Sequence, residues 1–391
     1  MDTPENRKSP LRRTGKELKN LVRLKNQPWR WRVGIQSGLA LGFPMGIFTL
    51  FGQPQWGSIA MLGAFTALYC PTLDRWDRLR VLPYVGLGLV LSSILGILFS
   101  FHIAASMLCV IAVTALASTL CQGIGMPPPG TVFFVLLAAV SSNLAGLHAH
   151  NGELVAPWWI PVLVSAGAVG AVLVVAATSL LPNKQETGEE EAVLPPSFKR
   201  FELDSETTAI TIRLTVGVAL ALLVGPYLGT FKSYWVVLPV VAILQMGHNR
   251  HLTLTRGIQR IIGTLMGVGL FAVLLQLPHP PAGLVLIVMF FQFAAEVVIT
   301  RNYALGLFFI TPLALFITTV GHPIDPEVVV RDRVINTVVG IGIAIVVYLI
   351  SQWIQGLKWR KAVRALASAN QGEGGQGTRD TRAPAMGQPD N

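Results

Sequence analysis

The sequence predicts an all-α integral membrane protein with about twelve transmembrane helices, arranged as two parallel six-helix repeats. Hydrophobic residues make up 52% of the chain and charged residues only 13%, whereas soluble domains carry about 25% charged residues. Between Arg80 and Lys184 the chain has no lysine or arginine, and its only acid is Glu153. A membrane-spanning helix needs roughly 20 mostly apolar residues, and a helix satisfies its own backbone hydrogen bonds within hydrocarbon. This stretch is therefore several spans in succession.

Apolar runs between breaker residues define the twelve predicted spans. Two of them, 55–71 and 233–247, are short and are expected to be tilted, broken or not fully spanning. The first repeat contains segments 32–51, 55–71, 82–101, 103–121, 130–147 and 158–181. The second repeat contains segments 208–229, 233–247, 258–276, 282–299, 303–320 and 333–354.

The distribution of basic residues predicts that both termini lie in the cytoplasm. With this orientation, the outer loops hold only Lys232, Arg331 and Arg333, and the other loop and tail cations fall inside. Positive charge is enriched on the cytoplasmic side of membrane proteins. Arg331 and Arg333 are expected at a helix start that faces a water-filled cavity. We also expect no cleavable signal peptide, because the basic lead is too long.

The spans divide the chain into five parts. A basic amphipathic lead (1–31) is followed by the first membrane repeat (32–182), hereafter the first half. An acidic cytoplasmic linker (183–206) then precedes the second membrane repeat (207–355), the second half. The last part (356–391) is expected to be basic and then disordered, since residues 370–391 are rich in Gly, Gln and Pro.

The two halves resemble each other in sequence. Arg32 opens the first span and Arg213 the seventh, while Trp56 and Trp235 each begin a short segment that leads into a basic loop. Each half has an even number of predicted spans, so the halves point the same way, with a pseudo-twofold axis along the membrane normal.

Two sets of glycines predict close helix packing. Small residues spaced four apart let a neighbouring backbone approach. The positions are Gly34, Gly38, Gly42 and Gly46 in the first span, and Gly263 and Gly267 in the ninth.

Three ordered motifs in the second half resemble the fusaric acid resistance and aromatic acid exporter (FUSC) family. They are Tyr234-Trp235 followed by Arg256-x-x-x-Arg260-x-x-Gly263-Thr264, then Arg301-Asn302-Tyr303 leading to Phe309-Ile310-Thr311-Pro312-Leu313, then Arg333-Val334-Ile335-Asn336 through Gly340. The resemblance covers residues 208–354 and is looser in the first half.

The resemblance implies an efflux protein of the bacterial inner membrane, often for aromatic carboxylates. The chain departs from larger family members, which carry a soluble domain between the halves where this chain has a linker of about two dozen residues. Pro127-Pro128-Pro129-Gly130 also stands where the second half has Arg301-Asn302-Tyr303. The two halves are therefore expected to do different jobs.

Charged residues within spans are costly and usually face a cavity. Arginine binds carboxylates with two parallel hydrogen bonds, and aromatic rings can stack on an aromatic substrate. The predicted substrate-binding residues are Arg256, Arg260, Arg301, Asn302, Tyr303, Tyr234, Trp235, Arg331 and Arg333. Glu296 is the only acid well inside an apolar run and is the candidate proton carrier.

A structural explanation stands beside each of these roles. Arginines at span ends commonly set topology, and tyrosine and tryptophan commonly anchor helices at the membrane interface. Glu296 could simply pair with Arg301.

The sequence therefore predicts a proton-coupled exporter of small organic anions. Its partners are lipids, the anion and, in one possibility, further copies of itself, without nucleic acid. A passive anion channel, a scaffold subunit of an envelope assembly and, last, a membrane enzyme stay open as alternatives. No enzyme activity, cofactor or metal is expected, because the chain has no ATP-binding, nucleophile or dinucleotide motif. Cys70, Cys109 and Cys121 also lack the spacing of a metal site.

Overall fold

The computed structural model describes residues 24, 26–27, 29–151, 155–180, 201–230, 232–246, 250–276, 280–319 and 325–374. The amphipathic lead before Leu24, most of the acidic linker and the tail beyond Gly374 lie outside these residues, so their predicted character stays a prediction. Within the described ranges, all regular structure is helical.

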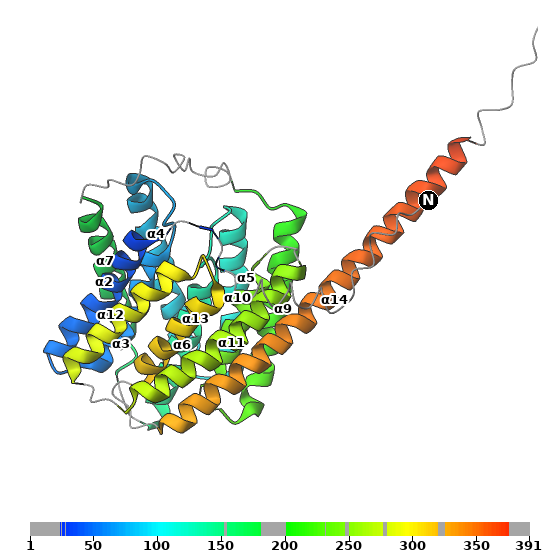
Figure 1. Cartoon of the computed structure of the whole chain (residues 1–391). Helices are drawn as coiled ribbons and strands as arrows, with labels where there is room; N and C mark the ends of the chain where they lie inside the picture. Colours follow the sequence, from blue (N-terminus) through cyan, green and yellow to red (C-terminus); the bar gives the residue numbers. More distant parts are fainter. Residues whose placement is uncertain are drawn as a thin grey trace, which may run out of the picture. The chain divides into compact units, whose positions relative to one another are not determined.

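The helices follow one another along the chain as Figure 1 shows. Their bounds are α2 (Trp31–Leu50), α3 (Pro54–Ala64), η2 (Phe65–Leu68), α4 (Arg75–Leu98), α5 (Ile103–Gly123), α6 (Val132–Asn151), α7 (Trp159–Ser179), α9 (Ser205–Val224), η3 (Gly225–Leu228), η4 (Ser233–Val236), α10 (Val237–Leu244), α11 (Arg250–Leu274), α12 (Pro281–Val298), α13 (Tyr303–Thr319) and α14 (Pro326–Gly374).

Seven helices of the described ranges are long and apolar enough to cross a membrane. They lie in α2, α4, α5, α7, α9 with η3, α11 and α14. Shorter apolar helices occupy Val132–Gly146, Tyr234–Leu244, Ala282–Val298 and Tyr303–Thr319. The chain is therefore an integral membrane protein, and a count of twelve spans stays a prediction.

Both segments predicted to be short are interrupted helices. Segment 55–71 is α3, which begins at Pro54 and tightens into the 3₁₀ turn η2. Segment 233–247 is the 3₁₀ turn η4 followed by α10, which has 8 residues. A helix of 8 residues is about 12 Å long, well short of the roughly 30 Å hydrocarbon layer.

Several helices begin earlier than the apolar pattern indicates, because their first turns are polar. α4 begins at Arg75, where the Asp74 carboxylate accepts a hydrogen bond from the Trp76 N–H (3.1 Å). α11 begins at Arg250 and α14 at Pro326. Hydropathy alone does not register such capped, charged turns.

α9 is capped in the same way. The Thr207 N–H donates to the carboxylate of Asp204 (2.6 Å). This hydrogen bond stabilises the ionised form and holds the pKa of Asp204 below its ordinary value.

Residues 346–374 form a separate compact unit and are helical. The expectation of disorder from residue 370 was wrong for residues 370–374, which α14 includes.

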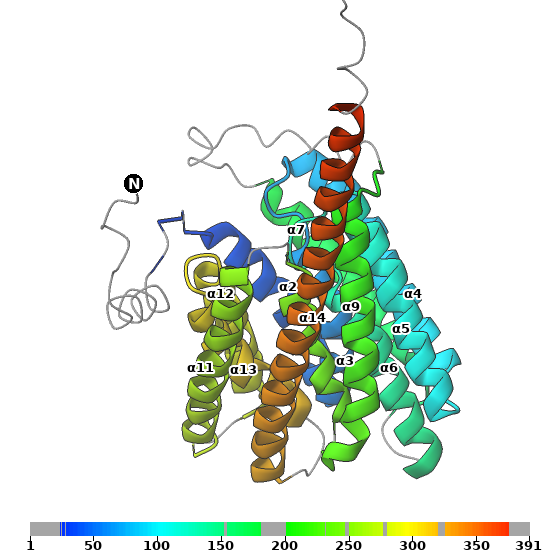
Figure 2. The same ribbon diagram turned by 90° about the vertical axis from the view of Figure 1, so that its right-hand side faces the viewer.

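Helices from the two halves pack against each other. α2 packs along α12, and α9 packs along α5. Within the halves, α4 packs on α6 and α11 on α13. Figure 2 shows α11, α12 and α13 grouped together, and α4, α5 and α6 grouped together.

Glycines mark the closest of these contacts. A Cβ atom at Gly34 would lie 2.8 Å from a Val297 methyl, and one at Gly38 would lie 2.8 Å from the Met289 carbonyl oxygen. Gly42 faces the Met289 side chain, whereas a Cβ at Gly46 would have its nearest neighbour at 3.6 Å. In α11, Gly263 and Gly267 lie against the backbone of α13 at Ala304 and Phe308. These glycines therefore allow α2 to meet α12 and α11 to meet α13.

Candidate functional site

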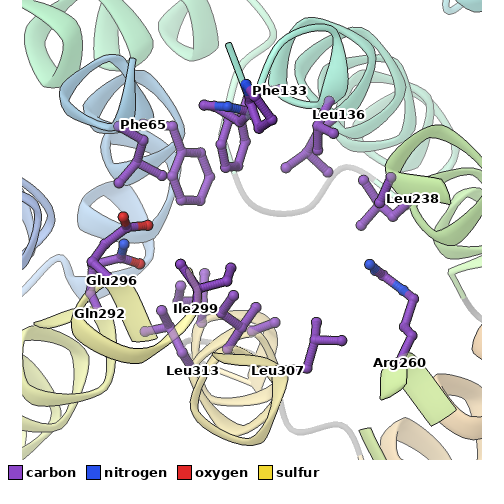
Figure 3. Close-up of a pocket in the computed structure, with 18 of the residues that line it drawn as sticks. Phe65, Phe133, Leu136, Leu238, Arg260, Gln292, Glu296, Ile299, Leu307 and Leu313 are labelled. Carbon is purple, nitrogen blue, oxygen red and sulfur yellow. The ribbon is translucent and has the colours of Figure 1, made fainter. Parts of the chain in front are cut away.

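A cavity of about 1140 Å³ lies between helices of the two halves. Its walls come from α3, η2 and α6 of the first half, and from η4 and α10 to α14 of the second. In Figure 3, Phe65, Phe133 and Leu136 lie across the cavity from Leu307 and Leu313. The rings of Phe65 and Phe133 are stacked with their centroids 4.2 Å apart. Most of the wall is apolar.

The charges in this wall are strongly unequal. Among the described lining residues there is one acid, Glu296, and the cations are Arg30, Lys232, Arg256, Arg260, Arg301 and Arg333. Arg260 and Glu296 approach the cavity from opposite sides in Figure 3, with Gln292 beside Glu296. This imbalance makes the cavity attractive to anions.

Arg256, Arg260 and Tyr303 form one cluster in the wall. Arg256 and Arg260 are one turn apart on α11, so both side chains face the start of α13. The Arg260 Nη1 donates to the Tyr303 hydroxyl (2.7 Å), and the Arg256 guanidinium carbon lies 5.4 Å from the centroid of the same ring. Arg260 is 7% exposed, and its Nε has no hydrogen-bond partner among the described residues. Tyr303 thus holds two like charges together.

Asn302 lies beside this cluster and serves as the cap of α13. Its Oδ1 accepts hydrogen bonds from the N–H groups of Ala304 (2.9 Å) and Leu305 (3.2 Å). Asn302 also lines the cavity. This cap fixes the first turn of α13, and with it the direction in which the Tyr303 side chain extends.

Arg301 and Glu296 both contact the chain just before α2. The Arg301 Nε donates to the Gln27 carbonyl oxygen (2.6 Å), and its guanidinium carbon is 3.9 Å from the Trp29 ring centroid. Glu296 pairs with Arg30 (4.0 Å). The structure thus pairs Glu296 with Arg30, whereas the structural explanation offered from the sequence paired it with Arg301. Sequence reasoning missed Arg30 because it is distant along the chain and sits in a stretch of many basic residues.

Trp235 forms a second cluster with two cations. The Arg333 guanidinium carbon lies 5.0 Å from its ring centroid, and the Lys232 Nζ lies 5.6 Å from it. Tyr234 lines the cavity next to it. Arg331 is placed differently, because its side chain is 60% exposed, pairs with Asp332 (3.1 Å) and is not part of the cavity wall.

Two buried arginines that were not predicted as functional hold the ends of the interrupted helices. Arg78 donates to the carbonyl oxygens of Ala67 (2.6 Å) and Tyr69 (3.2 Å) at the end of η2, and to Gln36 Oε1 (2.7 Å). Arg213 donates to the carbonyl oxygens of Leu244 (2.9 Å) and Met246 (2.7 Å) at the end of α10. Carbonyls at a helix end lack intrahelical partners and carry partial negative charge. The sequence offered one signal for such caps, namely that both segments are short and were expected to be broken or not fully spanning.

Comparisons with known proteins find a family match within the second half. A family profile described as "Fusaric acid resistance protein-like" matches residues 219–347. The uncharacterized membrane protein YvaC of Bacillus subtilis is 30% identical over 184 residues, which is 47% of this chain and 28% of YvaC. The uncharacterized protein YhfK of Escherichia coli is 28% identical over 192 residues, which is 49% of this chain and 27% of YhfK.

The matched regions thus span less than a third of the length of these curated relatives. No solved structure matches the chain. The resemblance predicted from three motifs is confirmed: residues 219–347 of this chain match the fusaric acid resistance protein-like (FUSC) family.

Proposed function

We propose that this protein is an inner-membrane efflux transporter of small organic anions, with aromatic carboxylates as its substrate class and the proton gradient as its energy source. The observation that carries the proposal is Arg260, a buried guanidinium in the wall of a largely apolar cavity, with an Nε that has no partner among the described residues. A buried charge is costly unless it is paired. A bound carboxylate would supply the missing acceptor and the compensating charge.

The rest of the cavity supports the same class of substrate. Arg256, Arg301 and Asn302 lie around Arg260 and Tyr303 on the cavity wall, so a carboxylate there meets several donors. The stacked pair Phe65 and Phe133 gives an apolar surface for a ring. A site with apolar walls and a few convergent polar groups is typical of small-molecule pockets.

The helix contacts support two parallel repeats of six helices. Counted within each predicted repeat, the first helix packs on the fourth helix of the other repeat, as α2–α12 and α9–α5. The third helix packs on the fifth in both, as α4–α6 and α11–α13. A pseudo-twofold axis produces such reciprocal pairs. The cavity between the repeats would then be open to one side of the membrane at a time.

The first test replaces Arg260 by glutamine. Loss of a charge-assisted hydrogen bond of about 2 kcal/mol should lower anion affinity about 30-fold. Uptake of labelled benzoate into inverted membrane vesicles should therefore fall to background, while the amount of inserted protein is unchanged. Arg80→Gln is the matched control, because Arg80 is an exposed cation that pairs with Asp77 and is absent from the cavity wall. Normal uptake by the Arg260 variant would remove this arginine from the mechanism.

The second test concerns Glu296, the acid of the cavity wall. Glu296→Gln keeps the size and hydrogen-bonding capacity of the side chain but cannot exchange a proton. Uptake by this variant should no longer respond to an imposed pH difference, although benzoate still binds. If the pH response persists, Glu296 is not the proton carrier. A benzoate current through a planar bilayer without any pH difference would instead indicate a passive anion channel.

A further inference from the structure

The cavity extends beyond the arginines between apolar faces of α6 and α13. Residues one or two helical turns apart share one face of a helix, so each set of lining residues forms an apolar stripe. The stripes consist of Leu136, Val140 and Leu144 on α6, and of Leu307, Ala314 and Ile317 on α13. Of the described residues that line the cavity on α3, η2, α6 and α13, none is charged.

A third apolar stripe comes from α3 and η2, with Leu62 and Phe65. Phe65 stacks on Phe133 in the first turn of α6. The Tyr69 hydroxyl donates to the Gly130 carbonyl oxygen just before that helix (2.8 Å). The end of η2 therefore lies beside the start of α6.

All three stripes begin near the arginine cluster. Arg78, which donates to the Tyr69 carbonyl oxygen, also interacts electrostatically with Glu296. Glu296 lies near the end of α12, and the chain then turns directly into α13 at Tyr303. The end of η2, the start of α6 and the start of α13 thus lie at one end of the cavity, where Tyr303 accepts from Arg260. The stripes lead away from this end.

The cations of the second half lie on a different wall, formed by α11 and α14. A Cβ atom at Gly257 would lie 3.4 Å from a methyl carbon of Ile341, so the two helices are adjacent there. Arg260 of α11 also acts electrostatically on Arg333 of α14. These contacts join the two guanidinium groups in one positive wall.

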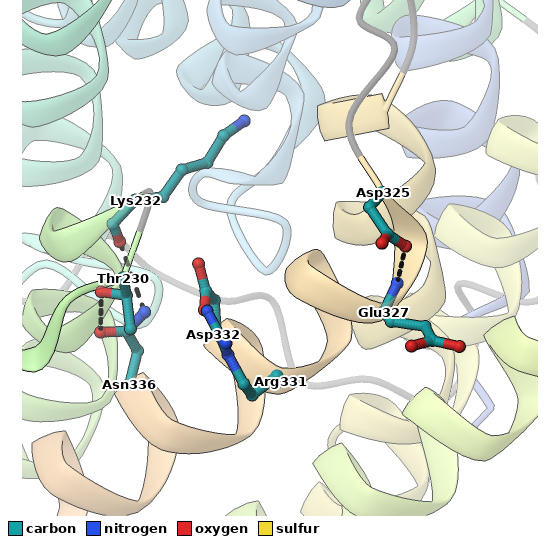
Figure 4. Close-up of polar contacts among 7 residues, drawn as sticks. All are labelled: Thr230, Lys232, Asp325, Glu327, Arg331, Asp332 and Asn336. Carbon is teal, nitrogen blue, oxygen red and sulfur yellow. Dashed lines mark hydrogen bonds and ion pairs between the residues drawn. The ribbon is translucent and has the colours of Figure 1, made fainter.

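Lys232 is held to the same wall. Its Nζ lies 5.6 Å from the Trp235 ring centroid, and the Arg333 guanidinium carbon lies 5.0 Å from it. In Figure 4 the Asn336 Nδ2 of α14 donates to the Lys232 carbonyl oxygen (3.5 Å), and its Oδ1 accepts from the Thr230 hydroxyl (3.3 Å). The cavity thus has a charged wall and three apolar stripes, which suits a ligand with a charged head and an apolar tail.

The stripes are longer than a single-ring acid. From Leu307 to Ile317 the wall of α13 rises about 15 Å, at about 1.5 Å per residue. An extended alkyl chain advances roughly 1.2 Å per bond, as an extended peptide backbone does, so about twelve carbons span the stripe. The cavity volume of about 1140 Å³ also exceeds the roughly 300–1,000 Å³ of pockets for drug-sized ligands. Benzoate at Arg260 would leave most of each stripe without a partner.

We propose that the preferred substrates are amphipathic carboxylates with a long apolar tail, of which straight-chain alkyl carboxylates of about ten to twelve carbons are the simplest. The carboxylate binds at Arg260, and the tail lies between the apolar stripes of α3, α6 and α13. Each methylene that leaves water for an apolar surface raises the affinity about fourfold. The inference rests on the proposed function in that the carboxylate binds at Arg260, and it extends the substrate class from single rings to longer apolar bodies.

The experiment measures the binding of a chain-length series to the purified protein in detergent. The probes are the straight-chain carboxylates from hexanoate to hexadecanoate, with benzoate as the short reference. Long acids also enter detergent micelles, so the concentration of free acid is measured by equilibrium dialysis in every sample. Affinity should rise about fourfold per methylene. It should level off near twelve carbons, where the tail reaches the polar side chains of Gln55 and Thr318.

Two variants shorten the apolar space. Ala314→Phe on α13 and Val140→Phe on α6 each place a ring across the stripes. Either variant should lower dodecanoate affinity at least tenfold and leave hexanoate affinity within twofold, because the shorter tail ends before the added ring. Ala177→Phe is the matched control, since Ala177 is exposed on α7 and is absent from the cavity wall. The two sites lie on different helices, so either suffices if the other variant fails to fold.

Head and tail are tested separately. Arg260→Gln should weaken hexanoate and dodecanoate by the same factor, about 30-fold, and should leave the ratio of the two affinities unchanged. Dodecanol has the tail without the carboxylate and should bind at least tenfold more weakly than dodecanoate.

An affinity that does not rise with chain length would overturn the inference. So would Ala314 and Val140 variants that weaken hexanoate and dodecanoate equally, or that weaken neither. Binding needs no transport and no proton gradient. If short acids bind through Arg260 and dodecanoate binds no better, the proposed function stands and the inference fails. If long acids bind as expected but none is transported, the amphipathic site stands and the transport function fails. A protein that binds no acid of any length would contradict both.

Discussion

Aromatic side chains in the cavity wall hold cations, a role different from the stacking platform that their residue types indicate. The Tyr303 hydroxyl accepts from Arg260, and its ring lies beside Arg256. Removing only the hydroxyl leaves the ring and its packing in place. It also leaves one more donor of a buried guanidinium without an acceptor, and such an unmade hydrogen bond costs about 1–3 kcal/mol.

Tyr303→Phe should therefore change anion binding more than it changes folding. Without its acceptor, the Arg260 guanidinium is free to turn, and benzoate affinity should fall about threefold to tenfold. Calorimetric titration of the purified protein measures this affinity, and thermal unfolding in detergent measures stability. Tyr84→Phe is the control, because Tyr84 is 78% exposed. Equal affinities for the Tyr303 variant and the native chain would exclude a positioning role for the hydroxyl.

The interrupted helices depend on charges that come from other helices. η2 ends against Arg78 of α4, and α10 ends against Arg213 of α9. Both elements line the cavity, so their carbonyl ends lie inside the protein, where water is not available to every group. A guanidinium has five donors in a fixed fork, which suits several carbonyls at one helix end.

Arg78→Met should lower the free energy of unfolding by about 3 kcal/mol, since three buried acceptors lose a charged donor. The expected signs are reduced yield and a lower midpoint of thermal unfolding in detergent. Arg75→Met is the matched control three residues earlier, where the guanidinium is exposed over the Trp76 ring. Its effect should stay within about 0.5 kcal/mol. Comparable losses for the two variants would contradict a capping role for Arg78.

At the scale of the whole molecule, the distribution of cations predicts how the chain is oriented in the membrane. The loop that precedes α4 lies next to the cations of the first turns of α4 and should face the cytoplasm, whereas the loop between α4 and α5 should face outward. Thr72 and His102 are exposed residues of these two loops. They are separated by one long apolar helix, α4.

An impermeant maleimide should therefore label His102→Cys but not Thr72→Cys in intact cells, and should label both after the cells are opened. Labelling is read by the mass of the purified protein. The three native cysteines are buried and serve as the internal blank. The reverse labelling pattern would mean that the chain has the opposite orientation in the membrane. The proposed export through the cavity would then be uptake.

The sequence predicted the helical class and a helix at each of the twelve expected places, because apolar run length and breakers are local properties. It also predicted the residue types that line the second-half wall, since the motifs with Arg256, Arg260 and Tyr303 are contiguous. The pairings could not be predicted in the same way. Glu296 meets Arg30, and Arg301 meets Gln27, only because the described residues just before α2 lie against the end of α12. Such contacts depend on tertiary packing, which no short pattern encodes.

The packing of helices of one half against helices of the other has a consequence for biogenesis. α2 packs on α12 through Gly34 and Gly38, and α5 meets α9 with the Ser118 and Thr211 hydroxyls 3.1 Å apart. During translation, α2 leaves the ribosome long before α12 (Pro281–Val298). The face of α2 that carries Gly34 and Gly38 therefore lacks its partner until α12 is synthesised, and until then lipid or an insertion factor must cover it. Final assembly of the first half is thus timed by translation of the second.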